Sequence, residues 1–530
     1  MRIDIVEKLE ERAAAVPDLS SGSGSDSGSV SVSGSDSNSD SGSVPSSEVV
    51  LHLAFEDRGN IPGLNVEPTG SAAAHGRTSL LYGAPGQKHA AIVGLGPALR
   101  LDAERLRRAA GTAARAVGRE GYRTAAVDLG PAADVLGEET CVQAWVEGWL
   151  LGSYSFDRYK METARKSAVS SLRLLIGSPG TDAPILGGNA AVRLAAEKAR
   201  WRAESTMLAR DWCNEPANVI TPERFAGEIE RRFSDLPGVG VRVYRGDALA
   251  ASGMNGLLAV SQGSRQAPAL VELTYASDPS LPLAALVGKG MTFDMGGMNV
   301  KTGRDLSEAR YDMGGACAVA GAFDLLARGG AAVNVAALIA IADNVPGSGA
   351  LLPSSVIRYP NGLTVQVGNT DAEGRLILAD ALLHAQRLGA AEIVDVATLT
   401  GSVGHALGLR VAGVWGDTDA VEELRACGES CGDRVWPMPL VDDDEELLRS
   451  DYADLNNISS SAYGGACAAA LFLRRFIGKG VRWAHIDMAN TVQAPGDRGY
   501  ESAGATGFGV RLLADYAERI AGNRASSSPL

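Results

Sequence analysis

Short apolar runs alternate with longer helix-like stretches along this chain of 530 residues, and this alternation limits its possible folds more than any other feature. In the first half, apolar runs occur at 49–55, 90–94 and 124–128, and helix-like stretches occur at 101–118 and 141–152. Parallel strands need crossover connections, which are usually helices, so this order is typical of a largely parallel sheet. The pattern therefore predicts an α/β fold.

The second half of the chain repeats the pattern with further buried-strand signals. These signals lie at 283–288, 332–342 and 393–397, and helical stretches lie between them at 314–328 and 376–388. Continuous apolar runs of this length indicate strands that are covered on both faces. We expect two α/β/α domains, of which the C-terminal one is larger and has a mixed sheet flanked by helices.

Composition indicates where these domains begin and end. Residues 20–47 are almost entirely Ser, Gly and Asp, and such a segment buries too little apolar surface to offset the entropy lost on ordering. The first 19 residues have the pattern of a short amphipathic helix, and a turn signal follows residue 213. The expected order is a disordered tail (1–47), an N-terminal α/β domain (48–188), a connecting helix (189–213) and a C-terminal domain (214–530).

Charge and cysteine content argue against several classes of protein. The chain has 63 acidic and 49 basic residues, a net charge of −14, whereas nucleic acids and anionic membranes attract positively charged proteins. No stretch approaches the ~20 apolar residues of a membrane span. The six cysteines form no CxxC pair and fit a reducing compartment. We therefore expect a cytoplasmic protein that does not bind membranes, and the acidic net charge disfavours nucleic acids as partners.

Charged side chains gather among glycines in three segments of the second domain, at 287–301, 309–315 and 368–376. Four of them are carboxylates, which are costly to bury together unless cations neutralise them. Carboxylates without a neighbouring histidine suit Mg²⁺ or Mn²⁺, while Zn²⁺ also accepts oxygen ligands. Four acidic groups fit two ions about 3.5–4 Å apart better than one. The charged side chains on offer are Lys289, Asp294, Lys301, Asp312, Asp371, Glu373 and Arg375.

These segments resemble the leucyl aminopeptidase, or cytosol aminopeptidase, family of two-metal metallopeptidases. The family signature NTDAEGRL is complete at 369–376, a GKGxTFD run lies at 288–294 and a DMGG run at 312–315. The resemblance extends over nearly all residues from about 205 to 515, whereas the N-terminal domain resembles the family only in size and α/β character. Supporting segments are RDWCNEPANVITP at 210–222, TLTG at 398–401, WPMPL at 436–440, ADLNN at 453–457, GGACAAALFL at 464–473 and ATGFGVRLL at 505–513.

The resemblance implies an aminopeptidase that releases N-terminal amino acids from peptides with a metal-bridged hydroxide. It implies two divalent ions per subunit, Mn²⁺ or Zn²⁺, and assigns metal ligands to them. Asp294 and Glu373 touch both ions, Lys289 and Asp312 complete the tighter site, and Asp371 completes the exchangeable one. A lysine ligand must be a neutral amine, and two adjacent dications supply the field that lowers its pKa.

The resemblance also implies the catalytic and substrate-binding groups. Lys301 stabilises the tetrahedral oxyanion, and Arg375 holds a bicarbonate ion that shuttles the proton. The free α-amino group of the peptide binds one ion, with help from Asp312 and the Leu399 carbonyl. The family assembles as homohexamers, so a homohexamer is expected here. The resemblance further implies that the side chain of the first substrate residue enters a pocket lined by Ala309, Thr398, Gly401, Ala489 and Val492.

The chain departs from the family pattern at four positions that we expect near the substrate. Ala309 and Arg310 stand where the family usually has Met-Lys, Met295 replaces a Ser, and Asn490 replaces a Gly. Because alanine at position 309 is smaller than the usual methionine, we expect a larger pocket. Arg310 can also point to solvent. The preference for leucine is therefore left open.

Two other functions remain open. The first is a dedicated processing or biosynthetic peptidase of the same fold with narrow specificity, which the altered pocket and the Ser-rich tail allow. The second is a DNA-binding regulator, as among some bacterial relatives of the family. The complete set of charged site residues and the acidic net charge favour an enzyme over this regulator.

Overall fold

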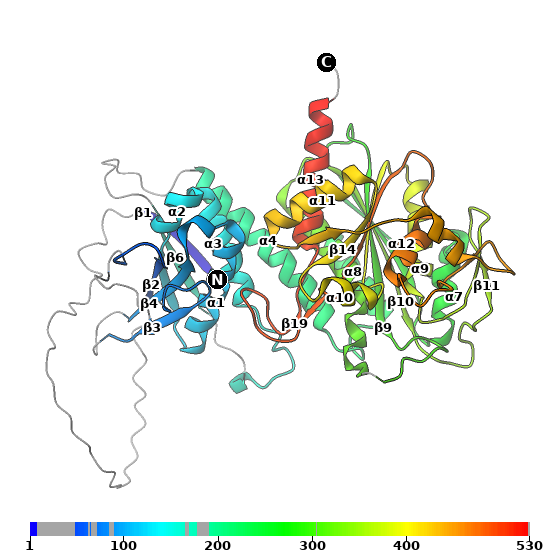
Figure 1. Cartoon of the computed structure of the whole chain (residues 1–530), viewed down its shortest axis with the longest axis horizontal. Helices are drawn as coiled ribbons and strands as arrows, with labels where there is room; N and C mark the ends of the chain where they lie inside the picture. Colours follow the sequence, from blue (N-terminus) through cyan, green and yellow to red (C-terminus); the bar gives the residue numbers. More distant parts are fainter. Residues whose placement is uncertain are drawn as a thin grey trace, which may run out of the picture. The chain divides into compact units, whose positions relative to one another are not determined.

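The chain divides into two compact units in this computed structural model (Figure 1). One unit contains residues 1–200 and 498–500, and the other contains 201–497 and 501–530. The long helix α4 (Ala190–Asn214) contains the division, and the domain limits expected from the sequence stay predictions. Of the tail expected over 1–47, residues 8–47 lie outside the described residues, while Arg2–Glu7 is a strand. Those described are 1–7, 48–61, 64, 71–83, 89–164, 169–176, 190–303 and 305–527.

A six-stranded sheet forms the centre of the first unit, with the strand order β1-β6-β5-β2-β4-β3. All neighbouring pairs are parallel except β3 and β4. The runs predicted at 49–55, 90–94 and 124–128 are confirmed as strands. The elements are β1 (Arg2–Glu7), β2 (Glu48–Phe55), β3 (Thr78–Leu81), β4 (His89–Gly96), β5 (Thr124–Asp128) and β6 (Ser171–Ile176), with α1 (Ala103–Arg119), α2 (Gly130–Leu136) and α3 (Glu138–Gly152).

The start of the chain differs from its sequence prediction. An amphipathic helix was expected over residues 1–19, but Arg2–Glu7 is strand β1 and pairs in parallel with β6. Its sequence RIDIVE alternates polar and apolar residues, so Ile3 and Ile5 share one face and pack against the core of this unit. The helix prediction is therefore wrong for residues 2–7, and residues 8–19 lie outside the described residues.

An eight-stranded mixed sheet forms the centre of the second unit, in the order β15-β14-β17-β13-β9-β10-β8-β7. The four strands β17, β13, β9 and β10 run parallel, whereas β7, β8 and β14 introduce antiparallel pairs. The mixed sheet confirms the prediction. Its strands are β7 (Val239–Tyr244), β8 (Ala269–Ala276), β9 (Ala284–Asp294), β10 (Asn334–Asn344), β13 (Glu392–Ala397), β14 (Ala412–Gly416), β15 (Val435–Pro437) and β17 (Arg482–Asp487).

Helices cover both faces of this sheet (Figure 1). Leu286 of β9 belongs to one hydrophobic cluster, and its neighbours Ala285 and Val287 belong to another, because successive strand residues face opposite sides. Helices α5 (Pro222–Phe233), α8 (Gly314–Gly329), α11 (Thr418–Cys431) and α13 (Val510–Ser527) contribute to the first cluster. Helices α6 (Asp247–Ala251), α7 (Asn255–Val260), α9 (Gly374–Arg387) and α12 (Gly465–Arg474) contribute to the second.

Smaller elements lie at the margins of the large sheet. They include a three-stranded sheet of β11 (Val356–Arg358), β12 (Thr364–Gln366) and β16 (Leu455–Asn456), and a pair formed by β18 (Gln493–Ala494) and β19 (Gly504–Ala505). A short helix, α10 (Ser402–Leu407), follows β13. Across the described ranges, we find no helix long and apolar enough to cross a membrane.

Candidate metal centre

Polar residues collect where four parallel strands of the large sheet end. Asp294 is the last residue of β9, Asn344 of β10 and Asp487 of β17, and Thr398 directly follows β13. Because these strands run in parallel, their carboxyl ends lie at one edge of the sheet, where open α/β sheets bind their ligands. The register of the sheet therefore brings together residues that are far apart in the sequence.

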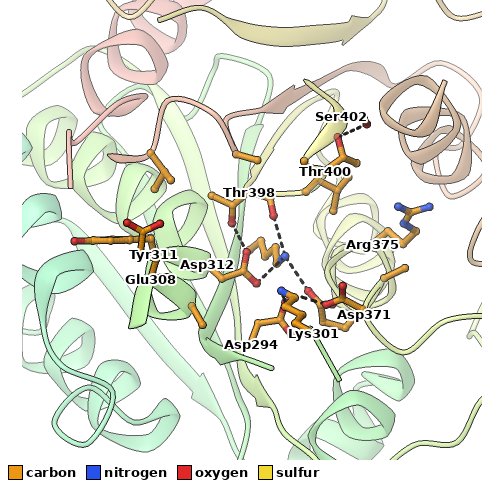
Figure 2. Close-up of a pocket in the computed structure, with 18 of the residues that line it drawn as sticks. Asp294, Lys301, Glu308, Tyr311, Asp312, Asp371, Arg375, Thr398, Thr400 and Ser402 are labelled. Carbon is orange, nitrogen blue, oxygen red and sulfur yellow. Dashed lines mark hydrogen bonds and ion pairs between the residues drawn. The ribbon is translucent and has the colours of Figure 1, made fainter. Parts of the chain in front are cut away.

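A single pocket of about 470 Å³ at this edge is lined by every site residue predicted from the sequence (Figure 2). The predicted residues come mainly from four parts of the chain, at the end of β9 and after it and following β12, β13 and β17. The structure thus brings the whole predicted set together, while the roles of its members stay predictions. The set consists of Lys289, Asp294, Lys301, Ala309, Asp312, Asp371, Glu373, Arg375, Thr398, Leu399, Gly401, Ala489 and Val492.

Three of the predicted metal ligands form a tight group of carboxylates. Asp294, Asp371 and Glu373 each offer an oxygen, and these oxygens lie within 4.8 Å of one another. Asp312 is outside this group, on the far side of the Lys289 amine. The Lys289 Nζ is 2.9 Å from Asp312 Oδ2 and 2.8 Å from Glu373 Oε1, so Lys289 connects the fourth carboxylate to the other three.

Lys289 and Lys301 contact the carboxylates directly. The cluster therefore differs from a site in which carboxylates alone surround the metal ions. Lys301 contacts Asp294, and its Nζ is 3.1 Å from Asp371 Oδ1. Lys289 is therefore paired as an ammonium ion here, whereas the family resemblance implies a neutral amine. Two ammonium groups among four carboxylates still leave two negative charges uncompensated. A cluster of this charge fits added divalent cations.

Burial shifts the pKa values of these groups. It raises the pKa of Asp294 to about 7, and the charges of Glu373 and Asp312 add to the effect while Lys301 and Lys289 oppose it. Burial likewise raises the pKa of Asp371 to about 6 against the opposing charge of Lys301. Asp294 is therefore partly protonated near neutral pH and Asp371 takes up its proton only below it, and a divalent cation that binds these carboxyl groups displaces the protons.

Glycines allow the backbone to come close to the charged side chains. A Cβ at Gly374 would lie 2.7 Å from the Lys289 Nζ, so any side chain there would displace the amine. Gly296 has a φ of +89°, and a Cβ at this position would lie 2.4 Å from the Asn299 carbonyl oxygen. The site therefore requires glycine at positions 374 and 296 to keep this geometry.

Arg375 points into the pocket from the start of α9 and is separated from the lysine-carboxylate contacts (Figure 2). Its Nη1 donates a hydrogen bond of 2.7 Å to the Asn457 carbonyl, and burial lowers its pKa to about 10. Its Nε has no hydrogen-bond partner among the residues that the structure describes. A buried guanidinium with an open donor fits a small anion.

Thr398 connects the substrate side of the pocket to the charged cluster. Its carbonyl accepts a hydrogen bond of 2.9 Å from Lys289 Nζ, and its hydroxyl donates one of 2.7 Å to Asp312 Oδ1. Leu399 and Gly401 follow along the same wall. The loop after β13 is thereby placed beside the predicted metal ligands.

Only one of the four departures from the family pattern lies at the pocket. Ala309 lines it, whereas Arg310, Met295 and Asn490 are not among the lining residues. The Arg310 guanidinium lies 4.9 Å from the centroid of the Tyr311 ring and donates to its hydroxyl at 3.0 Å. Asn490 donates to backbone carbonyls of the loop that precedes β14. The expectation that the departures gather around the substrate is therefore wrong for three of them.

Two asparagines support the carboxylates and were not identified from the sequence. Asn344 Nδ2 donates at 2.9 Å to Asp294 Oδ1 and at 2.9 Å to the Thr370 carbonyl. Asn457 accepts from the Gly368 amide at 2.8 Å and so holds the loop that leads to Asp371. A polar residue that ends the apolar run at 332–342 was the available signal for Asn344, since strand ends at this edge face the site.

Replacement of Asn344 by alanine is expected to weaken metal binding about 10- to 100-fold, because groups that orient metal ligands typically contribute this much. The change removes the amide that orients Asp294 and the loop at Thr370. Competition with a chromophoric chelator measures the affinity. Asn334→Ala is the matched control, since Asn334 lies at the opposite end of the same strand and donates to the Leu281 carbonyl. Equal affinities in the two variants would contradict the role of Asn344.

Comparison with known proteins agrees with this geometry. The family model described as "Cytosol aminopeptidase family, catalytic domain" matches residues 207–514, and the model for the N-terminal domain of the same family matches residues 67–163. The second match corrects the view that the N-terminal domain resembles the family only in size and character.

Relatives and solved structures give the same result. A probable cytosol aminopeptidase of Geobacter sulfurreducens is 42% identical over 428 residues, which are 80% of this chain and 84% of that protein. One of Streptomyces coelicolor is 38% identical over 471 residues, or 86% and 89%. The structure of the bottromycin maturation enzyme BotP in complex with Mn is similar, with a TM-score of 0.79 and 34% sequence identity. The similarity covers 90% of this chain and 100% of the BotP chain. The chain belongs to the cytosol aminopeptidase family of peptidases.

Proposed function

We propose that this protein is a metal-dependent aminopeptidase that removes single amino acids from peptides with a free N-terminus. The observation that carries the proposal is the buried cluster of four carboxylates and two lysines, which lines the same pocket as Arg375 and Thr398. This cluster keeps an excess of negative charge, and its oxygen donors suit hard divalent ions. Membership of the family makes peptides the substrate class.

The donor set fits two divalent ions, which we propose to be Mn²⁺ or Zn²⁺. Asp294, Asp371 and Glu373 would hold them, together with Asp312 and the neutral amine of Lys289. When bound, the ions supply Lewis-acid activation of water and of the scissile carbonyl. The related structure of BotP is a complex with Mn, which supports Mn²⁺ as one candidate.

The chain's own residues then bind and orient the substrate. The Lys301 amine donates to the oxygen that gains negative charge in the transition state. Asp312 and the Leu399 carbonyl accept hydrogen bonds from the free α-amino group, which restricts cleavage to the first residue. Arg375 would hold a bicarbonate ion through its open guanidinium donor, and such an ion would supply a base for the proton.

Cellular location and assembly are further parts of the proposal. A cytoplasmic location is supported by the six cysteines, none of which is in a disulfide in the described structure. A homohexamer is supported by resemblance to the family alone. Sedimentation equilibrium tests the assembly, and a monomer under all conditions would contradict this part without affecting the catalytic proposal.

Removal of metal is expected to abolish hydrolysis of leucine amide, because no side chain in the pocket replaces the Lewis acid. Re-addition of Mn²⁺ or Zn²⁺ to the chelated protein is expected to restore it. Addition of Mg²⁺ and Ca²⁺ in separate samples controls for non-specific effects of divalent charge. Activity that survives exhaustive chelation would overturn the metal mechanism.

A dedicated processing peptidase of the same fold is the second candidate, and one observation favours it. The structure of a bottromycin maturation enzyme is similar over 90% of the chain. The pocket wall also carries Ala309, where the family usually has a methionine. A panel of aminoacyl amides separates the two functions, since a general aminopeptidase cleaves several and a dedicated one few or none. The DNA-binding alternative predicts a mobility shift of duplex DNA at moderate salt, which the net charge of −14 disfavours.

A further inference from the structure

We propose that Asp487 is a positioning residue that holds the substrate-binding loop Thr398–Gly401 against the metal centre. The inference rests on the proposed function, because that function defines what the loop binds. Asp487 is not among the residues that line the pocket. It also lies outside the segments that carry the resemblance to the family. It acts through the backbone that it binds.

Asp487 ends strand β17 and is fully buried. Its Oδ1 accepts hydrogen bonds from the amides of Leu399 at 3.1 Å and Ala489 at 3.2 Å. Its Oδ2 accepts from the amide of Thr400 at 3.0 Å and from the Thr400 hydroxyl at 2.7 Å. One carboxylate therefore receives four donors, three of which come from the loop after β13.

No direct ion pair involves Asp487 in the described part of the chain, and the charges of His485 and Arg375 act on it only from a greater distance. The four hydrogen-bond donors are therefore its direct contacts. Hydrogen bonds to a buried ionised carboxylate are shorter and roughly twice as strong as neutral ones. A bare buried carboxylate is also very unfavourable, so movement of the loop away from Asp487 is strongly opposed.

Asp487 connects two walls of the pocket at once. On one wall, Thr398 of the loop contacts Lys289 and Asp312. The same loop carries the Leu399 carbonyl, which we propose binds the amino group of the substrate. Figure 2 shows Thr398 beside Asp312, with Thr400 further along. On the other wall, Ala489 lies two residues after Asp487 and lines the pocket. The carboxylate thus sets the spacing between the amino-group site and the side-chain pocket.

An Asp487→Asn variant is a sharp test, because it keeps the shape but replaces one acceptor oxygen by an NH₂ group. That group faces either the two Thr400 donors or the amides of Leu399 and Ala489, and donors repel donors. The loop is expected to shift. A displacement of about 1 Å at a substrate contact lowers the rate about 10²-fold.

The measurement compares two inhibitors that differ only in the α-amino group, leucine hydroxamate and 4-methylpentanehydroxamate. Both can bind metal ions through the hydroxamate, but only the first presents an amino group to the loop. In Asp487→Asn we expect at least about a tenfold loss of the preference for leucine hydroxamate, an order set by the loss of one positioned polar contact. The KM for leucine amide is expected to rise, and the metal content is expected to equal that of the unaltered protein.

Two further variants separate positioning from stability. Asp395→Asn is the matched control, because Asp395 is equally buried on the neighbouring strand and contacts Trp483 and His485 instead of the loop. It is expected to lower the melting temperature and to keep the inhibitor preference. Thr400→Val removes only one of the four contacts, so it is expected to change the preference in the same direction by less.

The outcomes either support or overturn the proposal. An unchanged inhibitor preference in Asp487→Asn, or an equal loss in Asp395→Asn, overturns it. If Asp487→Asn does not fold, Thr400→Val decides by its preference alone. Failure of the proposed function is distinguishable, since the unaltered protein would then bind neither metal nor leucine hydroxamate.

Discussion

Replacement of Glu373 by alanine is expected to abolish both metal binding and peptide hydrolysis. Glu373 is 2% exposed, offers an oxygen to the tight carboxylate group and lies 2.8 Å from the Lys289 Nζ. Its removal takes away a ligand proposed to touch both ions. Lewis-acid catalysis contributes several kcal/mol, so its loss lowers the rate on the order of 10³-fold or more.

Metal analysis and hydrolysis of leucine amide measure these two effects on the same sample. Glu392→Gln is the control, because Glu392 is equally buried but pairs with Arg482 at the opposite end of the sheet. This control is expected to retain both ions and measurable turnover. A Glu373→Ala protein that keeps two ions and hydrolyses peptides would show that Glu373 is not a ligand.

Replacement of Lys301 by alanine is expected to leave the ions bound and to lower kcat about 10²- to 10³-fold, as for other donors to a developing oxyanion. Lys301 lies among Asp294 and Asp371, so its removal also takes away a positive charge that competes with metal. Metal affinity is therefore expected to stay the same or to increase. Because the amine acts in the transition state, KM is expected to change little.

The alternative is that Lys301 serves only as a counter-ion to the carboxylates. In that case, Lys301→Ala with its full metal content would keep its kcat. Parallel measurement of kcat, KM and metal content distinguishes the two roles. Lys301→Arg adds a further comparison, since it keeps the charge but changes the shape of the donor.

Much of the fold and the site could be predicted from local patterns in the sequence. The apolar runs that become β9, β10 and β13 are continuous, because both faces of the sheet are covered. The charged residues that follow them stand among glycines, and their types indicate metal chemistry without any knowledge of distances. The pocket gathers all of these residues.

Other features depend on register and could not be predicted in this way. Asp487 and Asn344 end strands that pair with neighbours far away in the sequence, and nothing local shows which amides and carboxylates they meet. Arg310 was expected near the substrate or in solvent, yet its contacts with Tyr311 are decided by packing. Strand β1 was missed because its six residues also fit a helix when the partner strand β6 is unknown.

Titration of the chelated protein with Mn²⁺ tests the central claim most directly, because the whole account requires a binuclear site. We predict saturation at two ions per chain, with hydrolysis of leucine amide following occupancy, and no more than one ion in Asp371→Ala. Saturation at one ion or none, with activity independent of the added metal, would contradict the account.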